Sequence, residues 1–116
     1  MREKDDDVFI EHIMESIAAI KDFSKNMSKE ELMKNRLKRS AIVREIEIIG
    51  EAVKNISDDL KKRYRKVGWG NIARTRDKMI HHYFGIDVEI VWGILTKDIF
   101  ILEGQMKEIK KKLSKK

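Results

Sequence analysis

Apolar and charged residues follow one another along this chain at intervals of three and four, which is the spacing of amphipathic helices. No segment of useful length alternates at every second residue, as a half-buried strand would. Proline is absent, and charged residues make up 40% of the chain, interleaved with isoleucine, leucine, methionine and alanine. The pattern therefore predicts an all-α protein.

Cap residues divide this pattern into helices. Ser28 followed by Glu31 has the spacing of a capping box, and Ser57 with Asp58 suits the start of a short extra helix that ends near Tyr64. The four long helices are expected at about residues 5–24, 28–56 with a break near 34–39, 71–84 and 88–112.

The connections between these helices are short. Gly85 suits the C-terminal cap of the third long helix, and Asp87 suits the N-cap of the last one. Long amphipathic helices joined by short connections favour an up-and-down four-helix bundle. At 116 residues without a linker, the chain is expected to be one domain spanning residues 1–116.

Each long helix is expected to bury one apolar stripe. On the first, the expected stripe is Val8, Phe9, His12, Ala19, Ile20 and Phe23. On the second, it is Ile42, Ile46, Ile49, Val53 and Ile56, and on the last it is Val91, Ile94, Leu95, Leu102, Met106, Ile109 and Leu113. A histidine on such a face is interpreted as structural rather than catalytic.

Composition adds three expectations. The chain has no cysteine, which excludes disulfides and thiolate metal sites and favours a reducing, cytoplasmic setting. Its apolar runs are too short for a membrane span, and the acidic start does not resemble a signal peptide. The net charge of +6 permits attraction to phosphate, but much of the excess lies in a lysine run near the C-terminus whose simplest interpretation is a solvated helix end.

Arg76 departs from the pattern of the third helix. On a helical wheel it falls in the middle of the apolar stripe, where a leucine would be expected. A buried guanidinium needs an internal carboxylate or a protein-built cleft. Asp98 falls inside the stripe of the last helix, so a purely structural Arg76–Asp98 pair is one alternative, and a functional cleft is the other.

His81, His82 and Tyr83 follow on the same predicted helix. The dipole at a helix C-terminus favours a charged imidazole, which suits acid–base chemistry. Arg76 and Tyr83 would share one face, whereas Arg76 and His81 would be about 140° apart on the wheel. A symmetric dimer would bring Arg76 and His81 of two chains together, so the sequence predicts a two-fold dimer.

The segment from Arg76 to Asp87, RDKMIHHYFGID, resembles the Arg-x4-His-x-Tyr signature of the HepT-like toxins in the HEPN superfamily. The resemblance extends to residues 44–52 (REIEIIGEA), to Trp69 and to the last helix, and covers about residues 8–105. Both His81 and His82 fit the superfamily's looser spacing, and the tyrosine that follows selects His81. A proline expected shortly before the tryptophan is missing, which affects the turn at 66–70 rather than the site.

The resemblance implies a HEPN-type bundle that dimerises and cuts single-stranded RNA without a metal or other cofactor. It implies that Arg76 and His81 are catalytic and that Tyr83 is adenylylated by a small MNT-type nucleotidyltransferase antitoxin, in a dimer or a larger hetero-oligomer. His82, Asp98 and Glu51 are secondary candidates for the site. Glu51, with Glu47 and Arg44, is also explained as a surface ion-pair cluster.

Two alternatives remain open. One is a non-catalytic HEPN bundle that binds a nucleotidyltransferase or a nucleotide. The other is a structural dimerisation bundle in which Arg76 and Asp98 form only a buried pair.

Overall fold

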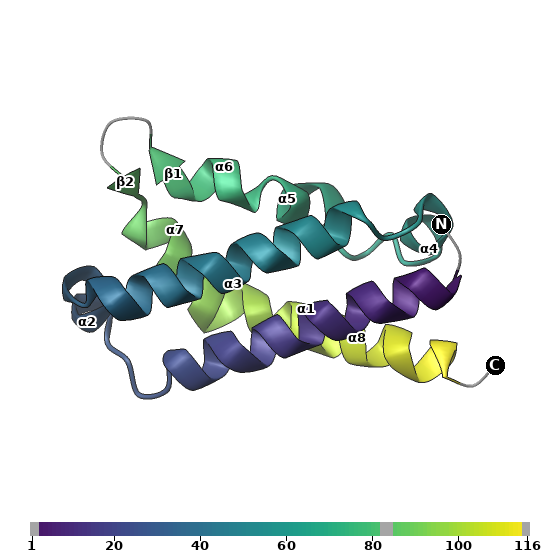
Figure 1. The fold of residues 1–116 in the computed structure, drawn as a ribbon, viewed down its shortest axis with the longest axis horizontal. Helices are drawn as coiled ribbons and strands as arrows, with labels where there is room; N and C mark the ends of the chain where they lie inside the picture. Colours follow the sequence, from purple (N-terminus) through teal and green to yellow (C-terminus); the bar gives the residue numbers. More distant parts are fainter. Residues whose placement is uncertain (1–2, 82–84, 115–116) are drawn as a thin grey trace.

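A computed structural model of the chain describes residues 3–81 and 85–114, which form an up-and-down bundle (Figure 1). Its four antiparallel segments are α1 (Glu3–Phe23), α3 (Arg36–Lys54), α5 (Trp69–Ala73) continued by α6 (Thr75–Met79), and α7 (Val88–Gly93), η1 (Ile94–Asp98) and α8 (Ile99–Leu113). Two short helices, α2 (Lys29–Lys34) and α4 (Asp58–Arg63), lie at the turns. The predicted all-α fold is confirmed.

The predicted caps set the helix boundaries. The Ser28 hydroxyl accepts from the Glu31 N–H at 3.0 Å, and the Ser57 hydroxyl accepts from the Leu60 N–H at 3.2 Å. Asn35, inside the expected break at 34–39, ends α2, and its side chain caps α3. Each side chain satisfies a backbone N–H that lacks an intrahelical acceptor, which is why local sequence was enough to locate these ends.

The core lies between α1, α3 and α8. Buried side chains come from all three and from the shorter helices, and the fully buried ones include Ile10, Ile13, Ile20, Leu32 of α2, Ile42, Val53, Met79 of α6 and Met106. The stripe predicted for the first helix was wrong in part, because Val8 is 50% exposed and His12 is also exposed. The buried face of α1 is instead centred on its isoleucines, which pack against α3 and α8.

The third segment differs most from its prediction. Its helix stops at Met79, and β1 (Ile80–His81) pairs antiparallel with β2 (Gly85–Ile86) in a small hairpin. The Met79 carbonyl accepts from the Asp87 N–H at 2.7 Å, a bond that replaces continuation of the helix. The expected helix to residue 84 was therefore wrong, as was Gly85 as its cap: Gly85 lies in β2 with φ of +81°, a conformation that glycine adopts at little cost.

The fourth segment is one long helix interrupted by a π-helical stretch. The predicted N-cap is present, since the Asp87 carboxylate accepts from the Ile90 N–H at 3.2 Å. Residues Ile94–Asp98 then form η1 before the α-helix resumes at Ile99. A π turn holds more residues than an α turn, so it shifts the helix face that follows.

A buried polar contact joins the first segment to α4. Asp6 is fully buried, and its two carboxylate oxygens accept from the Ser57 N–H at 2.8 Å and the Ser57 hydroxyl at 2.6 Å. The same hydroxyl oxygen caps α4 through Leu60. The start of α1 is thus tied to the start of α4 by bonds that leave neither partner unsatisfied.

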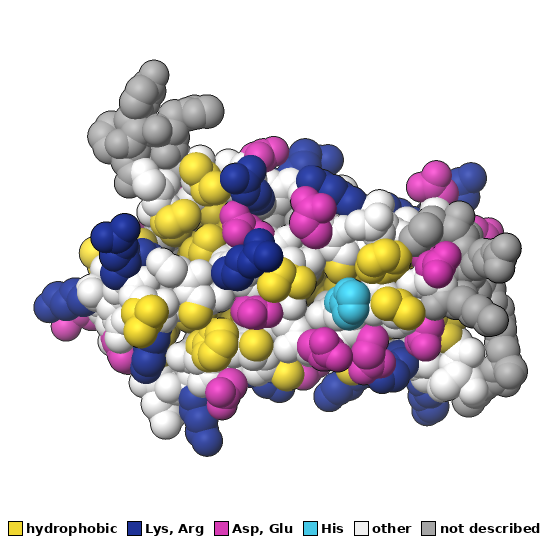
Figure 2. Space-filling view, viewed as in Figure 1, with side chains coloured by type: hydrophobic (Ala, Val, Ile, Leu, Met, Phe, Trp, Pro, Cys, Tyr) yellow, Lys and Arg dark blue, Asp and Glu magenta, His cyan; other side chains and the backbone are white. Residues whose placement is uncertain are grey.

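The face formed mainly by α1 and α3 carries interspersed positive and negative side chains (Figure 2). The exposed His12 ring meets the Phe9 ring edge-on, with 6.0 Å between centroids. The buried position expected for His12 was wrong, and its structural role stays a prediction. None of the helices in the described part of the chain is both long enough and apolar enough to cross a membrane.

Candidate functional site

Arg76 lies on α6, on the side that packs against α3. Its Nε donates to Glu47 Oε2 at 3.0 Å, and its side chain remains 65% exposed, against 23% for Glu47. Glu47 is also 4.0 Å from Nη1 of Arg44, one turn earlier on α3. The guanidinium is therefore fixed along one edge while most of the group stays open to solvent.

The alternative in which Arg76 and Asp98 form a buried pair was wrong. Asp98 is exposed on η1 and forms no ion pair within the described residues, whereas Glu47 takes the role assigned to it. The helix axis changes at Arg74, which separates α5 from α6 with φ −96° and ψ 6°. Because of this break, the wheel drawn for one continuous helix placed Arg76 in the apolar stripe, when it faces α3 at the surface.

A small pocket of about 210 Å³ surrounds the Arg76 side chain. It is lined by Arg44, Glu47, Gly50, Glu51, Lys54, Ala73 and Arg76. Gly50 faces α5 here, and a β-carbon at this position would lie 3.4 Å from the Ile72 carbonyl oxygen, which is an ordinary contact distance. The walls carry three basic and two acidic groups, so this shallow pocket can accept an anion beside Arg76.

Glu51 takes part in the ion-pair cluster expected for it. It is 70% exposed and 3.4 Å from the Lys54 ammonium, three residues later on α3. It lines the same pocket as Arg76 without contacting it. The sequence placed Glu47 in the same surface cluster and did not predict that it binds Arg76. Nothing in the local sequence of α3 indicates this contact, because it forms only when α3 packs against α6.

His81 is the second residue of β1, where it pairs with Gly85. The hairpin follows α6 directly, so Arg76 and His81 belong to two different elements rather than to one helix. His82 and Tyr83 lie outside the described residues, as does the His81 side chain. The angle between Arg76 and His81 on a helical wheel was the reason for expecting a second chain. That reason no longer applies, because His81 lies in an extended strand and not on the helix of Arg76.

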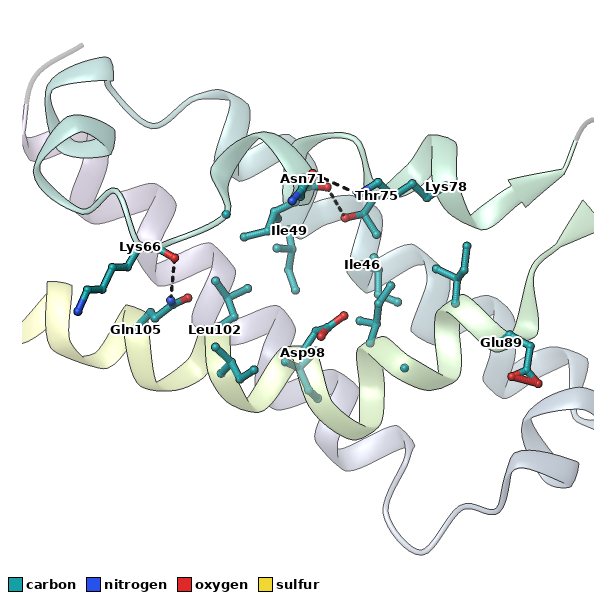
Figure 3. Close-up of a pocket in the computed structure, with 17 residues that line it drawn as sticks. Ile46, Ile49, Lys66, Asn71, Thr75, Lys78, Glu89, Asp98, Leu102 and Gln105 are labelled. Carbon is teal, nitrogen blue, oxygen red and sulfur yellow. Dashed lines mark hydrogen bonds between the residues drawn. The ribbon is translucent and has the colours of Figure 1, made fainter.

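The opposite side of the third segment borders a larger groove of about 550 Å³ (Figure 3). Asn71, Thr75 and Lys78 face it from α5 and α6, and Asp98 faces it from η1. Apolar side chains of α3 and α8, such as Ile46 and Leu102, form much of its lining. No sequence pattern indicated this groove. The side of the last helix on which Asp98 lies depends on the π turn, which the sequence did not predict.

Hydrogen bonds order the polar wall of the groove. Asn71 accepts at its carbonyl from the Thr75 hydroxyl at 3.0 Å and at its side chain from the Lys78 ammonium at 3.4 Å. At the other end, the Gln105 amide donates to the Lys66 carbonyl at 3.4 Å (Figure 3). Within the described residues, no group of three or more histidine, cysteine or acidic side chains is placed to hold a metal.

Comparison with known proteins identifies a family and several similar proteins. The family described as Ribonuclease HepT-like matches residues 13–109. A Methanocaldococcus jannaschii protein named as a candidate RNase is 42% identical over 94% of this chain and 93% of its own length. A protein of Thermococcus cleftensis, assigned by name as a ribonuclease HepT, is 38% identical over 89% of this chain and 94% of its own length.

A third relative, from Caldanaerobacter subterraneus and also named as a candidate RNase, is 41% identical over 90% of this chain and 93% of its own length. No solved structure matches the chain. The three relatives are covered almost end to end, so the similarity concerns the whole domain rather than one motif.

Proposed function

The chain belongs to the HepT-like ribonuclease family, and from this premise we propose that it is a toxin endoribonuclease that cuts single-stranded RNA, with Arg76 and His81 as its catalytic residues. The fold resembles the expected HEPN-type bundle. RNA is the substrate class that the family and the names of its relatives support.

The observation that carries the proposal is the state of Arg76. Glu47 binds its Nε and, within the described residues, accepts no bond from the two terminal nitrogens. Those nitrogens form the fork that matches two non-bridging phosphate oxygens. An arginine held at one edge and 65% exposed is thus ready to bind phosphate without first breaking a buried contact.

The proposed reaction needs no metal. The RNA 2′-hydroxyl attacks the adjacent phosphorus and loses its proton to a general base, while the P–O5′ bond breaks and the leaving oxygen gains a proton. His81 supplies this proton transfer, which usually contributes about 10² to 10⁴ in rate. Arg76 stabilises the negative charge that develops on the non-bridging oxygens.

We propose that an antitoxin of the MNT nucleotidyltransferase type silences this site at Tyr83. The tyrosine oxygen would attack the α-phosphorus of ATP, release pyrophosphate and carry AMP. Tyr83 follows His81 by two residues, so the added phosphate would bring negative charge close to the site that must bind RNA.

We also propose that the working form is a homodimer, alone or within a larger complex with the antitoxin, in the cytoplasm. The pocket at Arg76 is shallow, and a reaction that relies on charge stabilisation gains from the exclusion of water. A second chain over this surface would provide that exclusion.

The test uses purified protein and a labelled single-stranded RNA in buffer with EDTA. Arg76→Ala and His81→Ala should each lower the cleavage rate at least 100-fold, and His82→Ala should lower it much less. Circular dichroism of each variant checks that the fold is intact. Cleavage that survives both substitutions would assign the chemistry to other residues, and activity lost in EDTA would contradict the metal-free reaction.

If the folded wild-type protein cuts no RNA, the non-catalytic alternative replaces the enzyme. Binding of the nucleotidyltransferase partner to the same surface would then be measured with wild type and Arg76→Ala.

A further inference from the structure

The strongest concentration of positive charge lies away from Arg76, in and just after α4. Five of the six consecutive residues 61–66, KKRYRK, are basic, and the sixth is Tyr64. All of them except Lys61 and the tyrosine are exposed. A basic run interrupted by an aromatic residue is a common feature of surfaces that bind nucleic acid.

The end of α8 adds a second basic group to the first. Lys112 places its ammonium 5.6 Å from the centre of the Tyr64 ring, and Gln105 bonds to the Lys66 carbonyl. These contacts join two segments that are well separated in sequence. The combined α4/α8 surface consists of Lys61, Lys62, Arg63, Arg65, Lys66, Lys107, Lys110, Lys111 and Lys112.

Several of these charges lack a counter-charge. Lys107, Lys110 and Lys112 pair with Glu103, Glu11 and Glu108, which neutralises part of the α8 contribution. Within residues 3–81 and 85–114, no carboxylate pairs with Lys62, Arg65 or Lys111, all of which are exposed. The α1/α3 face, by contrast, mixes both signs (Figure 2).

The position of this surface fits a long ligand. The α4/α8 surface and the β1–β2 hairpin lie toward opposite ends of the longest axis, along which the molecule measures 46 Å (Figure 1). An RNA of only a few nucleotides is too short to reach from one to the other, whereas an RNA of about 20 nucleotides is long enough. Lys78 on α6 and Lys66 beside α4 lie at opposite ends of the groove, so each end carries a cation, with Asp98 between them (Figure 3).

We propose that the α4/α8 surface is an anchoring site for the phosphate backbone of the RNA substrate, distinct from the site that cuts it. The inference rests on the proposed function for the choice of RNA over an acidic protein. The unpaired cations attract phosphate without base specificity, so the surface adds affinity for long RNA rather than sequence preference.

The test measures binding in the cleavage-deficient Arg76→Ala background at several salt concentrations. The surface variant carries Lys62→Gln, Arg65→Gln and Lys111→Gln. The control carries Lys25→Gln, Arg36→Gln and Lys97→Gln, which removes the same charge from exposed residues elsewhere. Single-stranded RNAs of about 5 and about 20 nucleotides serve as probes, within and beyond the usual site size.

For the long RNA, the surface variant should bind at least about tenfold more weakly at low salt than the control. The slope of log K against log salt should fall in magnitude by about 2, because each phosphate that a cation neutralises on a single strand contributes about 0.7. The short RNA should bind both variants equally. Equal affinities of the two variants for the long RNA would overturn the proposal.

A competition arm separates RNA from acidic protein. Polyglutamate at matched charge should displace the long RNA poorly, and efficient displacement would reassign the surface to an acidic partner. Because binding is measured without cleavage, the two proposals fail separately. Surface-dependent binding by a wild-type protein that cuts nothing would contradict only the proposed function, and unimpaired long-RNA binding by the surface variant of an active enzyme would contradict only the anchoring site.

Discussion

Two of the polar contacts that join helical segments of this protein differ in how exposed their charged group is. In the Asp6–Ser57 contact the Asp6 carboxylate is fully buried, and both of its oxygens accept hydrogen bonds from Ser57. The Arg76–Glu47 contact bridges two helices equally directly, yet leaves the guanidinium 65% exposed with its terminal nitrogens available. We expect the first contact to stabilise the fold and, under the proposed function, the second to hold Arg76 in position for a phosphate.

The largest expected effect is on the Asp6–Ser57 contact. Asp6→Ala would remove the acceptor of the partly buried Ser57 N–H and hydroxyl, so the free energy of unfolding should fall by about 2 kcal/mol. Urea denaturation measures the loss. The neighbouring Asp7→Ala is the control, because Asp7 is exposed and should change stability by less than about 0.5 kcal/mol. Equal losses at both positions would mean that the Asp6–Ser57 contact adds no more to the free energy of unfolding than an exposed aspartate does.

The Arg76–Glu47 contact should show the opposite behaviour. Glu47→Gln keeps an acceptor for Arg76 but removes its charge, so we expect kcat for RNA cleavage to fall about tenfold while stability changes by less than about 0.5 kcal/mol. The KM for RNA should not rise, because a negative charge near the phosphate has been removed. Such a result would make Glu47 a positioning residue rather than a catalytic one.

Glu51→Gln is the matched control for Glu47. It removes the same charge from the same helix and the same pocket, but Glu51 pairs with Lys54 instead of Arg76. Its kcat should stay within about twofold of wild type. A loss as large as that of Glu47→Gln would show that the pocket's net charge matters, not the bond to Arg76.

A small effect on stability is expected in the hairpin that carries His81. Gly85→Ala meets no atom within 4 Å, so its cost is only that of the backbone at φ +81°, about 1 kcal/mol of stability. Gly104→Ala in α8 also meets no atom, but there alanine should stabilise by about 0.5 to 1 kcal/mol. Thermal denaturation compares the two, and shifts in the same direction would contradict the conformation assigned to Gly85.

The sequence predicted what local chemistry decides. Ser28, Ser57 and Asp87 cap helices through their own neighbours, and their positions were correct. The Arg76 motif was also recognised, because its spacing is a sequence property. The contact between Arg76 and Glu47 spans 29 residues, and nothing in either local pattern specifies it.

Two wrong predictions and one contact that the sequence did not indicate have physical causes. No proline or glycine marks the end of α6, so the tertiary hairpin bond from Asp87 to Met79 could not be anticipated. The bend at Arg74 moved Arg76 from the expected stripe to the surface. Asp6 sits in an acidic run that is typical of a solvated terminus, although it is buried by a partner 51 residues away.

The π-helical segment Ile94–Asp98 has a consequence for comparing this protein with others. Its wider turn accommodates an extra residue relative to a regular helix, so α7 and α8 do not share one heptad phase. An alignment with a relative whose last helix is regular must place a one-residue gap inside this segment. If the gap is placed elsewhere, either the hairpin-side residues of α7 or the core residues of α8 are matched to the wrong positions.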